Sequence, residues 1–569
     1  MVLIALLCIA LYAPFLGNKL VNWDDMILIT TNPVVQQFDI VRGFSTFDPE
    51  LYIPATLLSY EIEHALFGNA PWIFHLTNLT LHILNAVLVF RIIALLSRNR
   101  AVGLLTALLF ALHPINTEAV VWASARKDLL SAFFFLLTVF LYLKENRWSI
   151  GAFFLGLLAK VTIAPLPLVL LLIDVWEDRT VDRKNLRSKW QYFLLSVAFG
   201  IIALFGKSNT ISVLAMADYP LLSAKNLLFT LEKIFMPIGL SAIYPQLTAI
   251  RIGAPEFFVP LLAFAAGATA LVLLRKRFPI AAWCGAWFLL LFAPCFLTFS
   301  KNGYVFFASD RYAYLAGIGV FFFVGIALAS VASRGQALSL AARGFGIVLL
   351  AVCFLLSRQQ AGYWANSGTL MQRAIALEYD HPLVENNLGS ALLEEGKNNE
   401  AFAAFITAGE AGNPQAYFNA AELQRAKGDG KQAIHLYQKG MQAARTRKAV
   451  GTQDLASHFA IGQMLLDQGN LAAAVKVFQE AAALGDNVVS AHVNLGTVLL
   501  QQGNVQSALE HFERATKLNR YSASAFYGLA HANAQLGRRP QAIEALQEAV
   551  DIDPKYLDAQ QQLDQLRGN

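Results

Sequence analysis

Residues 315–332 read LAGIGVFFFVGIALASVA, and residues 132–143 read AFFFLLTVFLYL. Neither stretch contains a charged side chain, and a helix needs roughly 20 apolar residues to cross the hydrocarbon core of a bilayer. Only a helix or a closed barrel satisfies its own backbone hydrogen bonds in lipid. Comparable stretches recur from the N-terminus to about residue 360, so they predict a membrane-embedded helical domain.

The same length test, applied along this domain, predicts about eleven membrane spans. They centre near residues 9, 84, 108, 136, 155, 168, 199, 264, 289, 322 and 350. From about residue 365 the sequence becomes rich in Ala, Gln, Glu, Asn and Gly, and none of its apolar runs is long enough to span a bilayer. We therefore predict an all-α chain with a polytopic membrane domain over residues 1–358 and a soluble helical domain over residues 365–569.

Basic residues set the predicted orientation, because Lys and Arg accumulate in loops that stay in the cytoplasm. The basic connections are residues 91–100, 144–147, 179–189, 275–277 and 334–343. With eleven spans they all fall on one side, so the soluble domain is predicted to be extracytoplasmic. For residues 1–17 the alternative is a cleaved signal peptide, but they lack a basic n-region and a small-x-small cleavage site.

Composition narrows the possible classes of protein. The cysteines, Cys8, Cys284, Cys295 and Cys353, all lie in apolar spans, where they are most simply buried small hydrophobic residues. No disulfide or zinc framework is indicated. The net charge of +5 is modest and is explained by the cytoplasmic loops, so the sequence gives no sign of nucleic-acid binding.

A glycine recurs in the soluble domain at positions 396, 428, 469, 503 and 537. Each is followed by alanine five residues later, by a large residue after nine and by a small residue after twelve. The last two intervals are 34 residues, the period of tetratricopeptide repeats, which this domain resembles over about residues 365–569. Such helix pairs stack into a solenoid with a concave surface, which favours binding of a protein or peptide over a role as a spacer.

Ionisable side chains gather on the predicted outer side of the membrane domain. Charges beside or within spans are costly and mark functional sites. Asp24 and Asp25 follow the first span, Lys160 interrupts an apolar hairpin, and Arg311 stands at the mouth of a late span. Residues 113–130, HPINTEAVVWASARKDLL, add a second charged loop. Its candidates are His113, Glu118, Arg126, Lys127 and Asp128, and helical spacing aligns His75 and His82 on one face of the second span.

Paired carboxylates beside several cations on one membrane face suit sugar transfer from a lipid-phosphate donor. Arg and Lys would bind the leaving phosphate, and a carboxylate would take the proton of an acceptor hydroxyl. Attack from the face opposite the phosphate would invert the anomeric centre. The structural alternatives are that the Asp pair caps a helix or pairs with Lys19, and that Arg311 anchors a helix at the interface.

Six stretches of the chain carry a resemblance to a known family. They are NWDD (22–25), YIPATLLSYEIEHALFG (52–68), FHLTNLTLH (74–82), HPINTEAVVWASARKDLLSAFFFLL (113–137), DRYAYLAGIG (310–319) and WANSGTL (364–370). In this order they resemble the C-type glycosyltransferases, most closely the transmembrane-and-tetratricopeptide (TMTC) protein O-mannosyltransferases and their bacterial relatives. Two departures are Val161, where relatives tend to have an acid, and YAYLAG in place of the commoner YLPS.

The resemblance implies roles for these residues. The catalytic carboxylate falls on Asp24 or Asp25, and we prefer Asp24. We assign the donor phosphate to Arg126, Lys127, Lys160 and Arg311, and supporting or acceptor contacts to His113, Glu118, Asp128, His75 and His82. A divalent metal could bridge Asp24, Glu118 and the phosphate, although no ligand spacing demands one and no other cofactor is indicated.

The predicted function is therefore transfer of a sugar from a polyprenyl-phosphate donor to Ser or Thr of an acceptor protein. It takes place on the extracytoplasmic face, in a bacterial inner membrane with the repeats in the periplasm or outside, and the repeats bind the acceptor. A chain ending near residue 362 should then still bind donor. The alternatives are an O-antigen-type ligase or polymerase, an enzyme that glycosylates lipid or glycan, and a non-enzymatic repeat scaffold. The ligase is disfavoured because the last outer loop is short.

Overall fold

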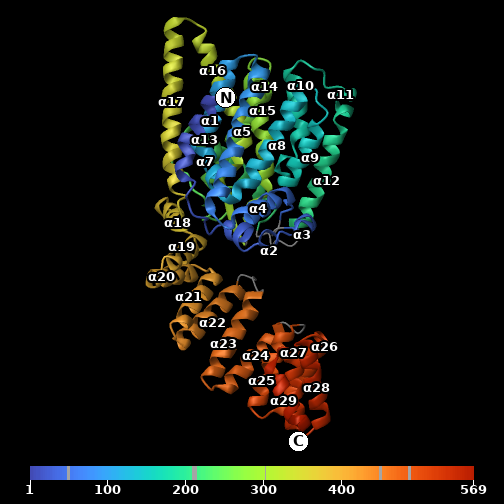
Figure 1. Ribbon diagram of the computed structural model, residues 1–569. Helices are drawn as coiled ribbons and strands as arrows, with labels where there is room; N and C mark the ends of the chain where they lie inside the picture. The colour runs from blue at the N-terminus through green and yellow to red at the C-terminus, as the bar shows by residue number, and fades with distance from the viewer. Residues whose placement is uncertain (48–50, 208–213, 302, 447–451, 485–487, 569) are drawn as a thin grey trace. The chain divides into compact units, whose positions relative to one another are not determined.

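The computed structural model describes residues 1–569 apart from residues 48–50, 208–213, 302, 447–451, 485–487 and 569 (Figure 1). Contacts divide the chain into two compact units, Met1–Ala391 and Leu392–Asn569. Packing thus divides the chain after Ala391, although its composition changes from apolar to polar near residue 360.

Eleven apolar helices build the first unit, and each predicted span centre lies within one of them. They are α1 (Val2–Tyr12), α5 (Pro71–Ser97), α6 (Arg100–Leu112), α8 (Arg126–Leu143), α9 (Ser149–Ala159), α10 (Leu166–Trp176), α12 (Trp190–Lys207), α14 (Pro255–Leu274), α15 (Pro279–Phe292), α16 (Ala313–Ala332) and α17 (Gln336–Gly362).

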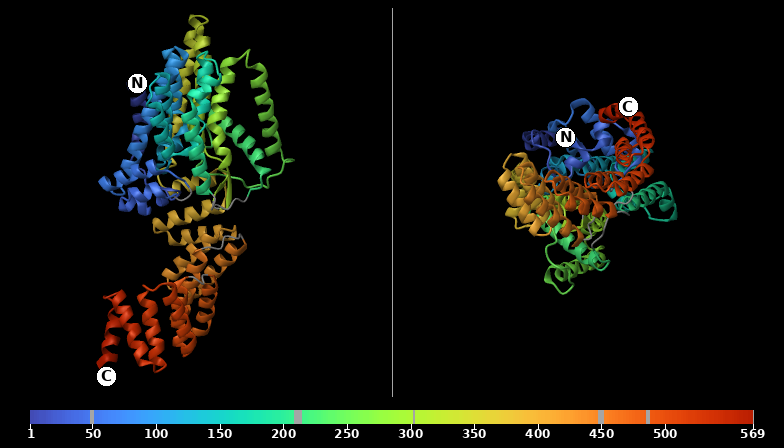
Figure 2. Two further views of the ribbon diagram at one scale, coloured as in Figure 1. Left: turned by 90° about the vertical axis from the view of Figure 1, so that its right-hand side faces the viewer. Right: turned by 90° about the horizontal axis from the view of Figure 1, so that it is seen from below.

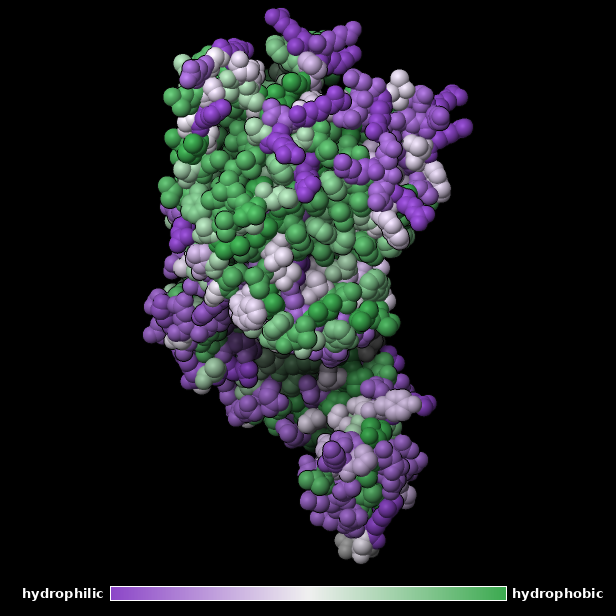
Figure 3. Space-filling model, turned by 45° about the horizontal axis from the view of Figure 1, so that its top comes forward, coloured by the Kyte–Doolittle hydropathy of each residue, from purple (hydrophilic) through white to green (hydrophobic). Residues whose placement is uncertain are grey.

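Among the described residues, five helical segments are long and apolar enough to cross a membrane, or six if the bent pair Arg100–Leu112 and Pro114–Val121 is one span. The five segments are built on α5, α14, α15, α16 and α17. Helices α1, α9, α10 and α12 are apolar but shorter. Figure 3 shows hydrophobic residues covering the flank of this unit and hydrophilic residues gathered at its end. Exposed side chains such as Leu194 and Ile201 on α12 and Phe345 on α17 fit a lipid-facing surface.

Glycines allow the closest approaches between these helices. A Cβ atom on Gly319 of α16 would lie 2.7 Å from the backbone oxygen of Cys284 on α15. One on Gly325 would lie 2.9 Å from Oγ1 of Thr106 on α6. Helix α16 is therefore held against α15 and α6, and this fixes the position of its N-terminus at the candidate site.

Further elements lie between the apolar helices or follow the last of them. The helices are α2 (Pro33–Gln37), α3 (Ile40–Ser45), α4 (Pro54–Phe67), α7 (Thr117–Val121), α11 (Arg183–Ser188), α13 (Asp218–Phe235), α18 (Ser367–Ala376) and α19 (Pro382–Glu394). A small antiparallel sheet has the order β1-β3-β2, with β1 at Tyr244–Pro245, β2 at Ser300–Lys301 and β3 at Tyr304–Ala308. The all-α prediction did not include this sheet, whose strands are too short to leave an alternating pattern.

The second unit consists of stacked helix pairs, which confirms the predicted repeats (Figures 1 and 2). The backbones of Gly428, Gly469, Gly503 and Gly537 all have positive φ, as expected for glycines that end a helix. The helices are α20 (Asn398–Glu410), α21 (Pro414–Ala426), α22 (Gly430–Thr446), α23 (Thr452–Asp467), α24 (Leu471–Leu484), α25 (Val489–Gln501), α26 (Val505–Leu518), α27 (Ala523–Gln535), α28 (Arg539–Ile552) and α29 (Leu557–Gly568).

Candidate active site

The two adjacent carboxylates of the loop after α1 have different surroundings. Asp25 is buried, and its oxygens accept hydrogen bonds from the backbone N–H of Val21 (2.8 Å) and from the backbone N–H (2.9 Å) and hydroxyl (2.5 Å) of Ser124. Burial raises the pKa of Asp25 to about 6, against the opposing effect of these hydrogen bonds. Asp25 therefore connects the loop after α1 to the segment that carries Ser124.

Asp24 instead faces cations. Nζ of Lys301 lies 2.8 Å from one carboxylate oxygen and Nζ of Lys127 lies 3.9 Å from the other. Burial alone would raise the pKa of Asp24, but the charges of Lys301 and Lys127 lower it to about 2. Asp24 is therefore ionised at neutral pH, and 18% of its side chain remains exposed.

A second group of charges surrounds a cavity of about 40 Å³. Arg311 and Asp128 both line it, together with Thr162 and Tyr312. Nη1 of Arg311 donates to Glu118 over 2.5 Å, and Lys160 pairs with Asp128 over 2.5 Å.

Within the part of the chain that the structure describes, Nε of Arg311 and Oδ2 of Asp128 are buried without a hydrogen-bond partner. Buried polar atoms are nearly always paired, so these two are suited to receive a ligand.

Trp122 joins the two groups of charges. Cζ of Arg311 lies 4.9 Å, and Nζ of Lys127 5.2 Å, from the centroid of the Trp122 ring. Cations at these distances are attracted to the face of an aromatic ring. The predicted residues Lys127 and Arg311 thus share one aromatic side chain, and Lys127 also pairs with Asp24.

Arg126 lies apart from this cluster. Its guanidinium donates to both carboxylate oxygens of Glu63, at 3.0 and 3.1 Å, to Oδ1 of Asn78 at 2.5 Å and to the backbone oxygen of Phe74 at 2.9 Å. The side chain is fully buried. Arg126 therefore joins the N-terminus of α8 to α4 and α5, and its nitrogens are already engaged by protein atoms.

The three predicted histidines also contact other parts of the protein. His75 bonds to the backbone oxygen of Asn18 (3.1 Å), and His82 contacts the Tyr314 hydroxyl (2.7 Å) and the Ala111 oxygen (3.0 Å). His113 contacts the Ile234 oxygen (2.9 Å). All three are buried between helices, so their position indicates a packing role.

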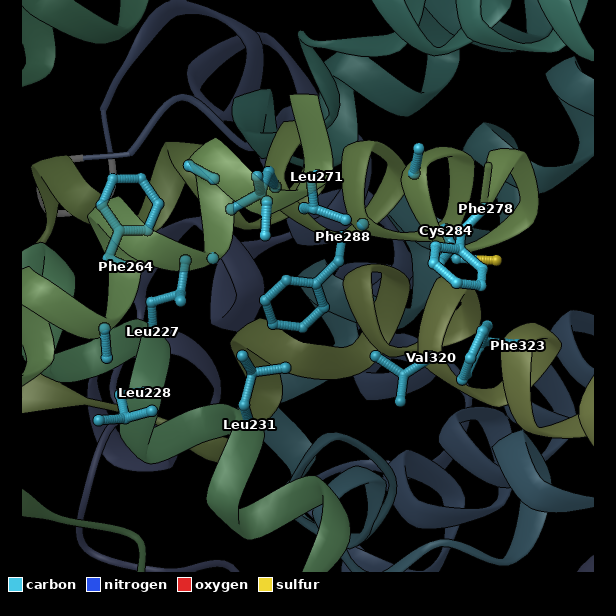
Figure 4. Close-up of a pocket in the computed structure, with 18 of the residues that line it drawn as sticks. Leu227, Leu228, Leu231, Phe264, Leu271, Phe278, Cys284, Phe288, Val320 and Phe323 are labelled. Carbon is cyan, nitrogen blue, oxygen red and sulfur yellow. The ribbon is translucent and has the colours of Figure 1, made fainter. Parts of the chain in front are cut away.

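An apolar cavity of about 470 Å³ lies among α13, α14, α15 and α16 (Figure 4). Leucine and phenylalanine side chains line most of it, including Leu231, Leu271 and Phe288. Helices α15 and α16 also lead to the polar cavity, which Leu291 and Leu315 help to line. Leu291 follows Phe288 by about one helical turn, so the two cavities border neighbouring turns of α15.

Lys301 and Glu63 are the charged residues that the sequence analysis missed. Lys301 belongs to the short strand β2, and the only signal for it was a lysine in a predicted outer loop. Glu63 lies on α4, and no sequence pattern indicates that Arg126 is its partner. Among the described residues, no three His, Cys, Asp or Glu side chains form a group that could hold a metal ion.

Comparison with known proteins finds similarity over parts of the chain. Residues 454–520 and 493–556 match tetratricopeptide-repeat families. Over 152 residues the chain is 36% identical to protein O-mannosyl-transferase Tmtc2 of Drosophila melanogaster, covering 24% of this chain and 16% of that protein. Human TMTC1 is 35% identical over 137 residues, with coverages of 22% and 15%. Human TMTC4 is 29% identical over 200 residues, with coverages of 32% and 23%. The matched segments span less than a quarter of each relative.

Solved structures also resemble part of the chain. YrrB, a tetratricopeptide-repeat protein with an unusual peptide-binding site, is 24% identical with a TM-score of 0.29, covering 34% of this chain and 96% of that one. MamA is 18% identical with a TM-score of 0.27, covering 31% and 94%.

Proposed function

We propose that this chain, a relative of the TMTC protein O-mannosyl-transferases, is a membrane glycosyltransferase that moves a sugar from a polyprenyl-phosphate donor to Ser or Thr of a protein. The observation that carries the proposal is that Asp24 pairs with Lys127 and Lys301 and also feels the charge of Arg311, which lines a polar cavity. We place the reaction on the extracytoplasmic face of a bacterial inner membrane, because the basic loops mark the other side as cytoplasmic.

The two cavities support a lipid-linked donor. A phosphate in the polar cavity would meet the unpartnered Nε of Arg311, and Lys127 contacts the same Trp122 ring as Arg311. Charge-assisted hydrogen bonds of this kind are the strong ones. The polyprenyl chain would occupy the apolar cavity, whose volume of about 470 Å³ is within the range of ligand sites.

In the proposed reaction, Asp24 takes the proton of the acceptor hydroxyl. The acceptor oxygen forms a bond with the anomeric carbon while the bond from that carbon to the phosphate oxygen breaks, leaving its electron pair on the phosphate. Arg311 and Lys127 stabilise the charge that develops there. Lys301, with 40% of its side chain exposed, has room to move from Asp24 when the hydroxyl arrives. Attack opposite the phosphate inverts the anomeric centre.

The repeats would bind the acceptor protein. Tethering the acceptor raises its effective concentration at the membrane, so the site itself need not read a strict sequence around the hydroxyl. A divalent metal that bridged Asp24 and Glu118 would compete with Lys301 and Arg311, which already bond to these carboxylates. Metal dependence is therefore part of the test below.

The full-length protein, reconstituted in liposomes, tests the function with polyprenyl-phosphate mannose and candidate periplasmic proteins. We expect a hexose on Ser or Thr by mass spectrometry, and no product from a nucleotide sugar in its place. Sugar found on lipid or glycan would favour the alternative enzymes. No transfer to any acceptor would favour the scaffold. Parallel reactions with and without a chelator report on a metal.

Filling the apolar cavity should weaken binding of long-chain donors. Gly267 lines it, and a Cβ atom there would meet no other atom within 4 Å, so Gly267→Phe should fold. We expect its KM for a long polyprenyl donor to rise about tenfold, the equivalent of about 1.4 kcal/mol of lost apolar burial.

The matched control is Gly344→Phe on α17. A Cβ atom on Gly344 likewise meets no atom within 4 Å, and Gly344 does not line the cavity. A short-chain donor should be used equally well by both variants and by the wild type. An unchanged KM for the long-chain donor in Gly267→Phe would show that the polyprenyl chain does not bind in this cavity.

Removing Lys301 should change the pH dependence of transfer. The lowered pKa of Asp24, about 2, keeps its base form present down to strongly acidic pH. In Lys301→Gln the pKa should rise toward the ordinary value of about 3.9, so the rate should begin to fall at higher pH than in the wild type. Single-turnover rates across pH measure this shift. Lys397→Gln, which removes an exposed lysine of the repeats, should keep the wild-type profile.

A further inference from the structure

The segment between the last apolar helix and the repeats is bonded to the loop that carries Asp24. Nδ2 of Asn18 donates to the backbone oxygen of Trp364 (3.1 Å), and the N–H of Lys19 donates to that of Ala365 (3.0 Å). The N–H of Asn22 donates to the hydroxyl of Ser367 (2.8 Å). Asn22 is two residues from Asp24, so these bonds fix the backbone on which the carboxylate stands.

The same segment supports the ring that orients the cations. Trp364 is 1% exposed and packs on Trp122, with ring centroids 5.8 Å apart and the planes 30° from parallel. Trp122 in turn lies under Lys127 and Arg311. Without Trp364, the Trp122 ring that Lys127 and Arg311 both contact would lose the side chain that packs against it.

Contacts with the strand hairpin complete this arrangement. His381, next to the first residue of α19, packs against Tyr304 at 4.7 Å and Phe306 at 5.8 Å between ring centroids. Tyr304 is the register partner of Lys301 in the sheet, and Phe306 also packs edge-on against Trp23. Residues 364–381 thus contact neighbours of both partners of the Asp24–Lys301 ion pair.

We propose that Ser367 and Trp364 are positioning residues of the transfer reaction: the junction before the repeats holds the loop of the catalytic carboxylate and the ring beneath the cations in place. The proposal rests on the proposed function. It also changes the expectation for a shortened chain, because a chain ending at residue 362 lacks the bonds to Asn18, Lys19 and Asn22 and should lose transfer chemistry as well as acceptor binding.

The test uses Ser367→Ala in the full-length protein. Misplacing a reacting group by about 1 Å can cost about 10²-fold in rate, so we expect kcat for a short acceptor peptide to fall between about tenfold and 10²-fold with an unchanged KM for donor. Ser367→Thr, which keeps the hydroxyl, should recover most of this loss. The acid limb of the pH–rate profile should move upward, because a looser loop weakens the pairing of Asp24 with Lys301.

The matched control is Thr369→Ala. Thr369 lies in the same helical turn and forms the capping box with Asn366, but among the described residues its hydrogen bonds go to Tyr363 and Asn366. Thr369→Ala removes one half of this capping box, which lowers helix stability without touching Asp24. Thr369→Ala should therefore lose thermal stability and keep the wild-type kcat and pH profile. Equal losses of kcat in both variants, or none in Ser367→Ala, would overturn the positioning role.

Trp364→Leu tests the aromatic contact separately. It should raise the KM for donor severalfold, because Lys127 and Arg311 lose their common support, while Trp364→Phe should restore the value. An unchanged KM in Trp364→Leu would overturn the role of Trp364.

Hydrogen exchange of residues 18–25 provides a readout that does not depend on the chemistry. It should be faster in Ser367→Ala than in Thr369→Ala. If the wild type transferred no sugar, the proposed function would fail, and the exchange rates would still decide whether the junction holds the loop. If the wild type is active and exchange is unchanged in Ser367→Ala, the positioning inference alone is wrong.

Discussion

Asp24→Asn should lower the rate of sugar transfer by about 10²–10⁴-fold, the usual cost of losing a general base, while the protein stays folded and binds donor. The amide keeps the shape of the carboxylate but cannot accept the proton. Lys127 and Lys301 lose a counter-charge, so affinity for the donor phosphate should be retained or increase. Single-turnover transfer and donor binding, measured on matched amounts of folded protein, separate these two effects.

Asp25→Asn is the matched control because it makes the same change one residue later. The Asp25 carboxylate accepts three hydrogen bonds from Val21 and Ser124, and an amide cannot accept all of them. Leaving a buried donor unpaired costs about 1–3 kcal/mol, so this variant should unfold at a lower temperature. If Asp25→Asn is stable and inactive while Asp24→Asn is active, the two roles are exchanged. Activity in both variants and in the double variant would disprove the carboxylate mechanism.

The pKa of Asp25 gives this control a further signature. A folded-state pKa near 6, above the ordinary value of about 3.9, means that the folded protein holds its proton more tightly than the unfolded chain. Stability attributable to this group is therefore present below about pH 4 and is lost as the pH rises through about 6. Asp25→Asn should remove this part of the pH dependence of stability, which Asp24→Asn should leave in place.

The helices and repeats could be predicted because their signals are local. An apolar run needs only its own residues to indicate a helix in lipid, and a turn glycine with alanine five residues later marks each repeat. The gathering of Lys127, Lys160 and Arg311 near carboxylates was also predictable in outline, since charges beside spans on one membrane face have few stable positions. The sequence could not indicate that Lys301 pairs with Asp24, because that contact depends on a strand pairing far along the chain.

Arg126 and Lys127 show why the sequence could not distinguish the roles of adjacent charged residues. Helix α8 begins at Arg126, and successive side chains on a helix point about 100° apart. One side chain therefore points to Glu63 on α4 and the other to Asp24. The direction of each depends on where the helix begins and on which neighbour packs there, and neither is visible in the letters RKD.

Arg126→Met should therefore reduce the stability of the protein by about 3–5 kcal/mol, since it leaves the Glu63 carboxylate buried without its partner. The fraction that folds should keep the wild-type KM for donor, because the guanidinium contacts Glu63, Asn78 and the Phe74 backbone. Thermal unfolding of the solubilised protein measures the first effect and donor titration the second.

Lys127→Met, the same change in the adjacent residue, should give the opposite result. Its ammonium group pairs with Asp24 and lies over Trp122, so its loss should weaken donor binding more than it lowers the unfolding temperature.

Adding Glu63→Leu to Arg126→Met should recover part of the lost stability, because apolar replacement of both partners of a buried ion pair is often neutral or stabilising. A stable Arg126→Met protein with a raised donor KM would instead show that Arg126 binds the donor phosphate, as predicted from the sequence.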